Sequence, residues 1–239
     1  MTSCADEAPA LAPLLSNANA LLLDFDGPVC AIFASTPASV VAEELSVRLR
    51  QVTGDRAADL NHDSDPLNVL RLAARYGPDV LKRIAEELTT AEERAVRGAA
   101  PTPGADSTLH ACKRIGLPVA IVSNNSMTAA SAYLAAHALG PYVTAVVGRT
   151  SANPDLMKPN PYLVQVAIGQ LGVPAHRAVL VGDSVTDIEA GRKAGVLTIG
   201  YANKPGKRGR LTAAGAYAVV RTMEELAIGL PVCSDSRSP

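Results

Sequence analysis

The sequence predicts an α/β protein in which a parallel sheet is covered by helices on both faces and interrupted by an all-helical insertion. From residue 103 onward, short apolar runs alternate with segments of helical periodicity, and strands that alternate with helices in this way form parallel sheets. Residues 29–102 instead show only helical spacing of apolar residues, directly after the first apolar run. We therefore predict a core of residues 20–28 and 103–230, with residues 29–102 inserted as a helical cap.

The composition is that of an ordinary globular chain. Of 239 residues, 48% are hydrophobic, and 22 Lys and Arg residues nearly balance 23 Asp and Glu residues, so no nucleic acid or membrane partner is expected. The segment before the first apolar run lacks Lys and Arg, unlike a signal peptide, and no apolar run is long enough to cross a bilayer. The four cysteines show no CxxC spacing, which favours a reducing compartment. We expect a cytoplasmic protein.

The N-terminal part of the chain is predicted to contain a leader, one buried strand and the helices of the cap. Residues 1–19 are rich in Ala, Pro, Ser and Asn, so we expect a flexible leader. Leu21-Leu22-Leu23 is an unbroken apolar run, too short for a helix, and is predicted to be a buried strand. In the cap, Ser35-Thr36-Pro37 is a helix-start signal, and helical spacing continues to about residue 97. Asp65 before proline caps a later helix in this region.

A Gly- and Pro-rich linker at residues 98–104 marks the return to the core. Beyond it, strands are predicted at residues 119–122, 143–147, 178–181, 196–199 and 218–220, and helices at residues 106–115, 128–139, 161–171 and 187–194. The basic segment 204–210 follows the strand at 196–199. It could attract anionic substrates, but we predict a solvated, mobile loop. Residues 231–239 are expected to form a flexible tail.

Two carboxylates close the first strand. Asp24 and Asp26 are separated by one residue, so in an extended segment their side chains point the same way. Two like charges facing one pocket need a cation or a shared proton. The pattern therefore indicates a site for metal-assisted chemistry, although Asp-x-Asp-Gly also occurs as an ordinary turn after a strand.

Polar side chains follow the other predicted strands as well. In open α/β sheets, ligands bind beyond the carboxyl ends of the strands. Carboxylate, hydroxyl, amide and ammonium groups gathered there would suit a divalent cation and a phosphoryl group. The residues at these ends are Asp24, Asp26, Ser123, Asn124, Asp183, Ser184 and Asp187, with Lys158 in a loop before a helix.

Each of these residues also has a purely structural interpretation. Ser123 could cap the next helix, and Asp187 could cap its own helix. Lys158, which precedes a proline, could be a solvated loop lysine. The functional interpretation depends on the combination rather than on any one residue.

The combination resembles the haloacid dehalogenase superfamily of phosphatases and phosphotransferases. Its four motifs are matched in order, over residues 21–200, by Asp24-Phe25-Asp26-Gly27, Val122-Ser123-Asn124, Lys158-Pro159 and Gly182-Asp183-Ser184-Val185-Thr186-Asp187. The insertion after the first strand resembles the helical cap of the subfamily that includes phosphoglycolate phosphatase and β-phosphoglucomutase. The resemblance implies a Rossmann-like core with an inserted helical cap.

The resemblance also implies a role for each motif. Asp24 would be the nucleophile that forms an aspartyl-phosphate, and Asp26 would protonate the leaving oxygen and later activate water. Ser123, Asn124 and Lys158 would bind the phosphoryl group.

The implied cofactor is Mg²⁺. Asp183 would bind it together with Asp24 and the main-chain carbonyl of Asp26, while Asp187 and Ser184 would support the metal's surroundings.

Asp26 narrows the chemistry further. Dehalogenases that resemble this fold lack a carboxylate two residues after the nucleophile, because halide leaves without protonation. Asp26 therefore favours an oxygen leaving group and hydrolysis of a phosphate ester. Gly27-Pro28 departs from the Asp-Gly-Thr pattern of many capped phosphatases, so the resemblance does not carry over a particular substrate.

We thus expect a Mg²⁺-dependent phosphatase that acts on a small-molecule phosphate ester, as a monomer or homodimer. An intramolecular phosphotransferase would use the same motifs, and a non-catalytic binding protein could keep the same fold. Arg56 and His62, in breaks between cap helices, are candidate specificity residues; they could equally be surface polar residues.

Overall fold

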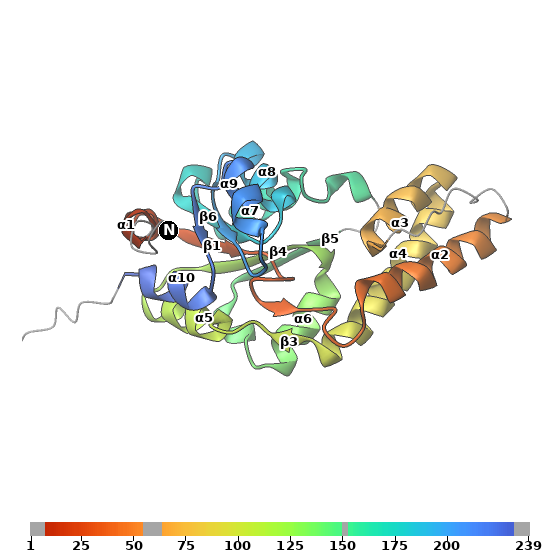
Figure 1. Cartoon of the computed structure of the whole chain (residues 1–239), viewed down its shortest axis with the longest axis horizontal. Coiled ribbons are helices and arrows are strands. Elements are labelled where there is room, and N and C mark those ends of the chain that lie inside the picture. The colour runs from red at the N-terminus through yellow and green to blue at the C-terminus, as the bar shows by residue number, and fades with distance from the viewer. Residues whose placement is uncertain (1–7, 55–63, 150–152, 232–239) are drawn as a thin grey trace, which may run out of the picture.

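The computed structural model describes residues 8–54, 64–149 and 153–231, and it confirms the predicted α/β architecture (Figure 1). Six parallel strands form one sheet in the order β5-β4-β1-β6-β7-β8. The strands are β1 (Ala20–Leu23), β4 (Val119–Ser126), β5 (Ala145–Arg149), β6 (Ala178–Gly182), β7 (Leu197–Tyr201) and β8 (Ala218–Val220). The central strand is therefore the first apolar run of the sequence.

Alternate residues of β1 face opposite sides of the sheet, as extended backbone requires. Leu21 and Leu23 belong to one large apolar cluster, and Ala20 and Leu22 belong to a second cluster. Helices α5 (Ala105–Arg114), α6 (Met127–Ala136) and α10 (Met223–Gly229) cover the first face, and α7 (Tyr162–Leu171) and α8 (Val185–Ala194) cover the second (Figure 1). Among the described residues, no helix is both long and apolar enough to span a bilayer.

The strand order places the start of a crevice at the end of β1. The chain moves from β1 to β4 on one side and from β5 across to β6 on the other, so β1 is paired with β4 and β6 at once. Leu23 is in register with Ile121 and with Val181. The segments that follow these three residues therefore start at the same level, at the kind of switch point where open α/β sheets bind ligands.

The inserted region forms its own helical group at one end of the molecule (Figure 1). It consists of α2 (Ala38–Thr53), α3 (Pro66–Ala73) and α4 (Pro78–Ala95), which we call the insert. Its inward-facing side chains make a separate apolar cluster that includes Val41, Leu45, Leu49, Leu70, Ile84 and Leu88. Asp65 caps α3 as predicted, because its side chain accepts a hydrogen bond from the Leu67 amide at 2.9 Å.

The prediction that residues 29–102 are all helical is wrong at both ends. Strands β2 (Cys30–Ala31) and β3 (Ala100–Pro101) pair antiparallel where the chain leaves and re-enters the core. Val29, Cys30 and Ile32 are buried in the main apolar cluster rather than with the insert. Strands of two residues are too short to show the alternation by which strands are identified in a sequence.

The expected flexible leader contains a packed helix, α1 (Ala8–Ser16). Leu11, Leu14 and Leu15 are buried in the main cluster, on the same face of the sheet as α10. The prediction gave too much weight to the Ala- and Pro-rich composition and too little to leucines at helical spacing. The expected tail lies, apart from Pro231, outside the described residues.

The packing of α1 predicts a measurable stability effect. Replacing Leu15 with Ala should lower the free energy of unfolding by about 2–4 kcal/mol, because the substitution leaves a cavity in a buried cluster. Chemical denaturation monitored by circular dichroism measures this difference, with Ser16→Ala on the exposed side of the same helix as the control. If both variants unfold like the wild type, α1 does not contribute to the core.

Candidate active site

The centre of the candidate site is the buried side chain of Lys158. Its Nζ lies 2.8 Å from Oδ1 of Asp24 and 2.5 Å from Oδ1 of Asp187, and it donates a hydrogen bond to the Val122 carbonyl at 2.9 Å. Only 1% of the residue is exposed. Burial alone would lower the pKa of Lys158, but the two carboxylates raise it above its ordinary value. The lysine is therefore a fixed positive charge and not a solvated loop residue.

Asp24 is held at the end of β1 by backbone contacts. Its amide donates to the Val181 carbonyl at 2.9 Å, and its Oδ1 accepts from the Phe25 amide at 2.8 Å. Burial raises the pKa of Asp24, and the nearby Asp187 carboxylate raises it further, while Lys158 acts in the opposite direction. A further positive charge near Asp24 would therefore lower its pKa and stabilise the ionised carboxylate.

Asp26 lines the same pocket. Its Oδ1 accepts a hydrogen bond from the Ile32 amide at 3.0 Å, which fixes the orientation of the carboxyl group. Burial raises the pKa of Asp26 to about 6, although the Ile32 hydrogen bond works against this rise. Such a group can both donate and accept a proton near neutral pH.

Gly27 permits the close approach of two motifs. Its φ is +111°, a backbone conformation that L side chains rarely adopt. A Cβ at this position would lie only 2.6 Å from Cγ of Asp183. Any larger residue would therefore push the Asp183 segment away from the end of β1.

Asp187 fills both of the roles considered for it. Its Oδ2 accepts from the Ser184 amide at 3.0 Å and from the Ser184 hydroxyl at 2.6 Å, and its own amide donates to Ser184 Oγ at 3.2 Å. This reciprocal capping box starts α8. The other oxygen, Oδ1, lies 2.5 Å from Nζ of Lys158. Helix capping therefore orients the carboxylate toward the site.

Three carboxylates converge closely enough to hold a metal ion. One oxygen each from Asp24, Asp183 and Asp187 lies within 4.8 Å of the other two. Oxygen ligands of this kind suit Mg²⁺. The residues therefore fit a divalent cation. The structure brings together Asp24 and Asp183, as predicted, and adds the side chain of Asp187, which the sequence placed only in a supporting role.

The basic segment 204–210 is not the solvated, mobile loop that we predicted. Lys207 begins a short helix, α9 (Lys207–Ala213), and its ammonium group forms an ion pair with Oδ2 of Asp183. Asn203 donates to the same oxygen at 3.2 Å. Leu211 anchors α9 in a small apolar cluster, which a charge-based interpretation of the segment overlooked.

Ser123 lies in the last part of β4, residues 123–126, which we call the Ser123 turn. Pairing between β4 and β5 is interrupted from Val122 to Ser126, which leaves room for this turn. The Ser123 hydroxyl donates to Oδ1 of Asn125 and accepts from the Asn125 amide, both at 3.1 Å. The residue that caps α6 is Ser126, whose side chain accepts from the Ala129 amide. The alternative that Ser123 serves as the helix cap is therefore wrong.

Asn124 connects this turn to the lysine. Its Oδ1 accepts from the Lys158 amide at 2.8 Å, and its Nδ2 donates to the Lys158 carbonyl at 3.1 Å. Two hydrogen bonds to one residue fix the backbone from which the buried ammonium group extends. The side chain of Asn124 thus positions Lys158, a function that the predicted phosphate-binding role did not include.

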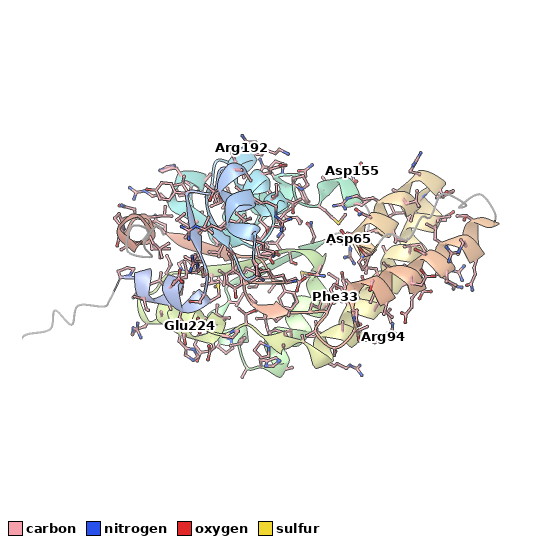
Figure 2. The ribbon with its side chains drawn as sticks, viewed as in Figure 1. Phe33, Asp65, Arg94, Asp155, Arg192 and Glu224 are labelled. Atoms are coloured by element: carbon pink, nitrogen blue, oxygen red, sulfur yellow. The ribbon has the colours of Figure 1, made fainter. Side chains whose placement is uncertain are left out.

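A pocket of about 300 Å³ joins these residues to the insert. The core supplies the amide groups and most of the acidic groups of this pocket. The side of the insert supplies apolar groups and two further carboxylates, from Phe33, Ala38, Pro66, Leu67, Asp65 and Glu92. Phe33 and Asp65 lie where the insert meets the core (Figure 2). Arg56 and His62, the predicted specificity residues, lie outside the described residues.

Two buried residues beside this pocket, Glu92 and Arg149, were not predicted from the sequence. Glu92 lines the pocket from α4, and its carboxylate forms an ion pair with Arg149 at 2.7 Å. Glu92 lies one helical turn after the buried Leu88, so a charge on the apolar face of the helix was a usable signal. Arg149 ends β5, and the rule applied to the other strand ends would have identified it.

Comparison with known proteins agrees with this arrangement. The model of a family described as "haloacid dehalogenase-like hydrolase" matches residues 18–195. A phosphoglycolate phosphatase of Caulobacter vibrioides is 32% identical over 152 residues, which cover 62% of this chain and 57% of that protein. The phosphoglycolate phosphatase of Rhodospirillum rubrum is 30% identical over 169 residues, which cover 69% of this chain and 61% of that protein. The matched part thus spans less than two thirds of these relatives.

A solved structure shares the fold over most of the chain. The crystal structure of CbbY from Rhodobacter sphaeroides in complex with phosphate is similar with a TM-score of 0.63 and 19% identity, covering 89% of this chain and 99% of that one. At this identity the likeness concerns the fold alone. The family match extends from the first strand to α8 and includes all four motifs of the site. The chain therefore belongs to the haloacid dehalogenase-like hydrolase family.

Proposed function

We propose that this protein is a Mg²⁺-dependent phosphatase that hydrolyses a small phosphorylated metabolite through an aspartyl-phosphate on Asp24. The observation that carries the proposal is the buried Lys158 ammonium, 2.8 Å from Asp24 and 2.5 Å from Asp187, beside the carboxylate of Asp183. A fixed cation next to a cluster of carboxylates is an arrangement that can stabilise a phosphoryl group as it is transferred.

Asp24 is the proposed nucleophile. Its carboxylate would attack phosphorus while the bond from phosphorus to the ester oxygen breaks, which leaves the phosphoryl group on Asp24. Lys158, in contact with the carboxylate, offsets the negative charge that the two reactants bring together. The hydroxyl of Ser123 and the amides of its turn are the proposed ligands of the phosphoryl oxygens.

Asp26 is the proposed acid and base. It would give its proton to the departing oxygen and then take a proton from the water that attacks the phosphorus of the aspartyl-phosphate, releasing inorganic phosphate. Its position in the lining of the pocket and its pKa of about 6 support this pair of tasks. The Ile32 amide keeps the carboxyl group oriented throughout.

The three carboxylates of Asp24, Asp183 and Asp187 are the proposed holders of the metal, together with the carbonyl of Asp26. When bound, Mg²⁺ would offset negative charge on both the nucleophile and the substrate. Lys207 forms an ion pair with Asp183, so this lysine would have to share that carboxylate with the ion.

The proposed substrate is a small molecule. A pocket of about 300 Å³ lies at the lower end of the range for small-molecule sites. Apolar side chains of the insert line the pocket together with the polar groups of the core. The insert would therefore surround the leaving group and exclude water. The phosphatase relatives act on phosphoglycolate, as their names state, which makes short phosphorylated acids and sugars the first compounds to test.

The first prediction concerns the nucleophile. Asp24→Asn should reduce the release of inorganic phosphate by at least about 1,000-fold, because the amide cannot form the covalent intermediate. Phosphate release from a panel of glycolate and sugar phosphates, with Mg²⁺ present, measures the effect, and Asp155→Asn on the exposed surface is the control. A normal rate in a folded Asp24→Asn variant is incompatible with the proposal.

The second prediction separates leaving groups. Asp26→Ala should lower kcat/KM by about 100-fold or more for alkyl phosphates, but much less for nitrophenyl phosphate, whose leaving group needs no proton. The measurement is kcat/KM for a series of esters that differ in leaving-group pKa. An equal loss for all esters would assign Asp26 a role other than proton donation.

The third prediction tests the metal site without turnover. Mg²⁺ should raise the Tm of the wild type, because an ion that binds only the folded state stabilises it. In Asp183→Asn the increase caused by Mg²⁺ should be greatly reduced, whereas Asp155→Asn should respond like the wild type. Differential scanning calorimetry with and without Mg²⁺ measures these shifts, and an undiminished shift in Asp183→Asn would remove that residue from the metal site.

A further inference from the structure

A carboxylate of the insert binds the turn that carries Ser123. Glu92, on α4, is fully buried, and its Oε2 accepts a hydrogen bond from the Ser126 amide at 2.8 Å. Its Oε1 accepts another from Nδ2 of Asn125 at 3.2 Å. Both donors belong to the Ser123 turn at the end of β4, so a side chain of the insert satisfies polar groups of the core.

Arg149 completes this arrangement from β5. Its Nη1 lies 2.7 Å from Oε1 of Glu92, and its Nη2 lies 3.2 Å from Oε2, a two-point contact between planar groups. Nη1 also donates to the Asn124 carbonyl at 3.0 Å, and Nη2 donates to Oγ1 of Thr89 at 3.3 Å. The arginine therefore contacts both the insert and the Ser123 turn while neutralising Glu92.

The hydrogen bonds continue from Glu92 to the reactive groups. Asn125, held by Glu92, accepts from the Ser123 hydroxyl, and Asn124, held by Arg149, fixes the backbone of Lys158. The chain of contacts thus leads from the insert to two groups in the proposed site of phosphoryl transfer.

We infer that Glu92 is a positioning residue: it orders the turn from Ser123 to Ser126 for phosphate binding, with Arg149 as its counter-charge. This inference rests on the proposed function and deepens it, because it assigns part of the phosphate site to the insert. The turn is then fully ordered only while α4 is packed against the core. A phosphate ester would bind less tightly whenever that contact is broken.

A purely structural role is the competing explanation, since a buried ion pair also joins the two parts of the chain. The two explanations differ when both charges are removed. Replacing a buried pair by apolar residues of similar size often leaves stability unchanged or increased. The double variant Glu92→Met/Arg149→Met should therefore stay folded, yet the Ser126 amide and the Asn125 side chain would lose their acceptor.

The experiment combines two measurements on the double variant. Amide hydrogen exchange at residues 123–126 should become about tenfold faster or more, and the Kd for inorganic phosphate with Mg²⁺ should rise by about tenfold or more, because charge-assisted hydrogen bonds are lost. Isothermal titration calorimetry measures the Kd. Glu87 lies on the same helix as Glu92 and forms an exposed ion pair with Arg48 of α2. Glu87→Gln is therefore the matched control and should leave both values unchanged.

Glu92→Gln gives an independent test should the double variant not fold. The amide keeps the size of the carboxylate but presents an NH₂ group to one of its donors, so exchange and Kd should change in the same direction by a smaller factor. Wild-type exchange and wild-type phosphate Kd in the folded double variant, or in Glu92→Gln, would overturn the inference. If the wild type itself releases no phosphate from any ester, the proposed function fails, while the exchange measurement still decides whether Glu92 orders the turn.

Discussion

The architecture of the site depends on one buried ammonium group. Lys158 is 1% exposed and contacts two carboxylates that lie far apart in the sequence, Asp24 and Asp187. A buried charge is tolerated only when it is paired and hydrogen-bonded. Removing the lysine would leave carboxylates that repel one another. The ion pairs therefore hold the ends of the strands together, and in the proposed function they also prepare the site for a phosphoryl group.

This requirement explains why the sheet has its particular form. The first apolar run becomes the central strand, so that the residues after β1, β4 and β6 converge at one crevice. Gly27 allows the Asp183 segment to approach, and the capping box of α8 aims one oxygen of Asp187 at the lysine. Local backbone chemistry thus determines the geometry of a site whose members are far apart along the chain.

The core and most of the site could be predicted because their signals are local. Asp24 and Asp183 follow unbroken apolar runs, and the end of a buried parallel strand is a predictable place for a ligand. Their proximity, in contrast, depends on strand order and register, which no local pattern contains. The predicted architecture is confirmed, and the geometry brings an oxygen of Asp24 within 4.8 Å of one of Asp183, with Asp187 as the third member of the cluster.

The features that were missed share a physical cause. The leucines of α1 lie in a Pro-containing segment whose composition concealed their helical spacing, and Lys207 acquires its partner only through the packing of α9. Glu92 and Arg149 form a pair across 57 residues of sequence, so neither has a local partner that would reveal its role. Burial and pairing of charges at long range are properties of the folded chain.

The central claim is that the phosphoryl group passes through Asp24, and the most direct measurement is to trap it there. The wild type is mixed with a phosphate ester that it hydrolyses and Mg²⁺, quenched in acid during turnover, and digested for mass spectrometry. We expect a phosphoryl group on Asp24 during turnover that disappears once the ester has been consumed. Release of phosphate with no covalent phosphoryl group on Asp24 at any time during turnover, or with one on another residue, would contradict it.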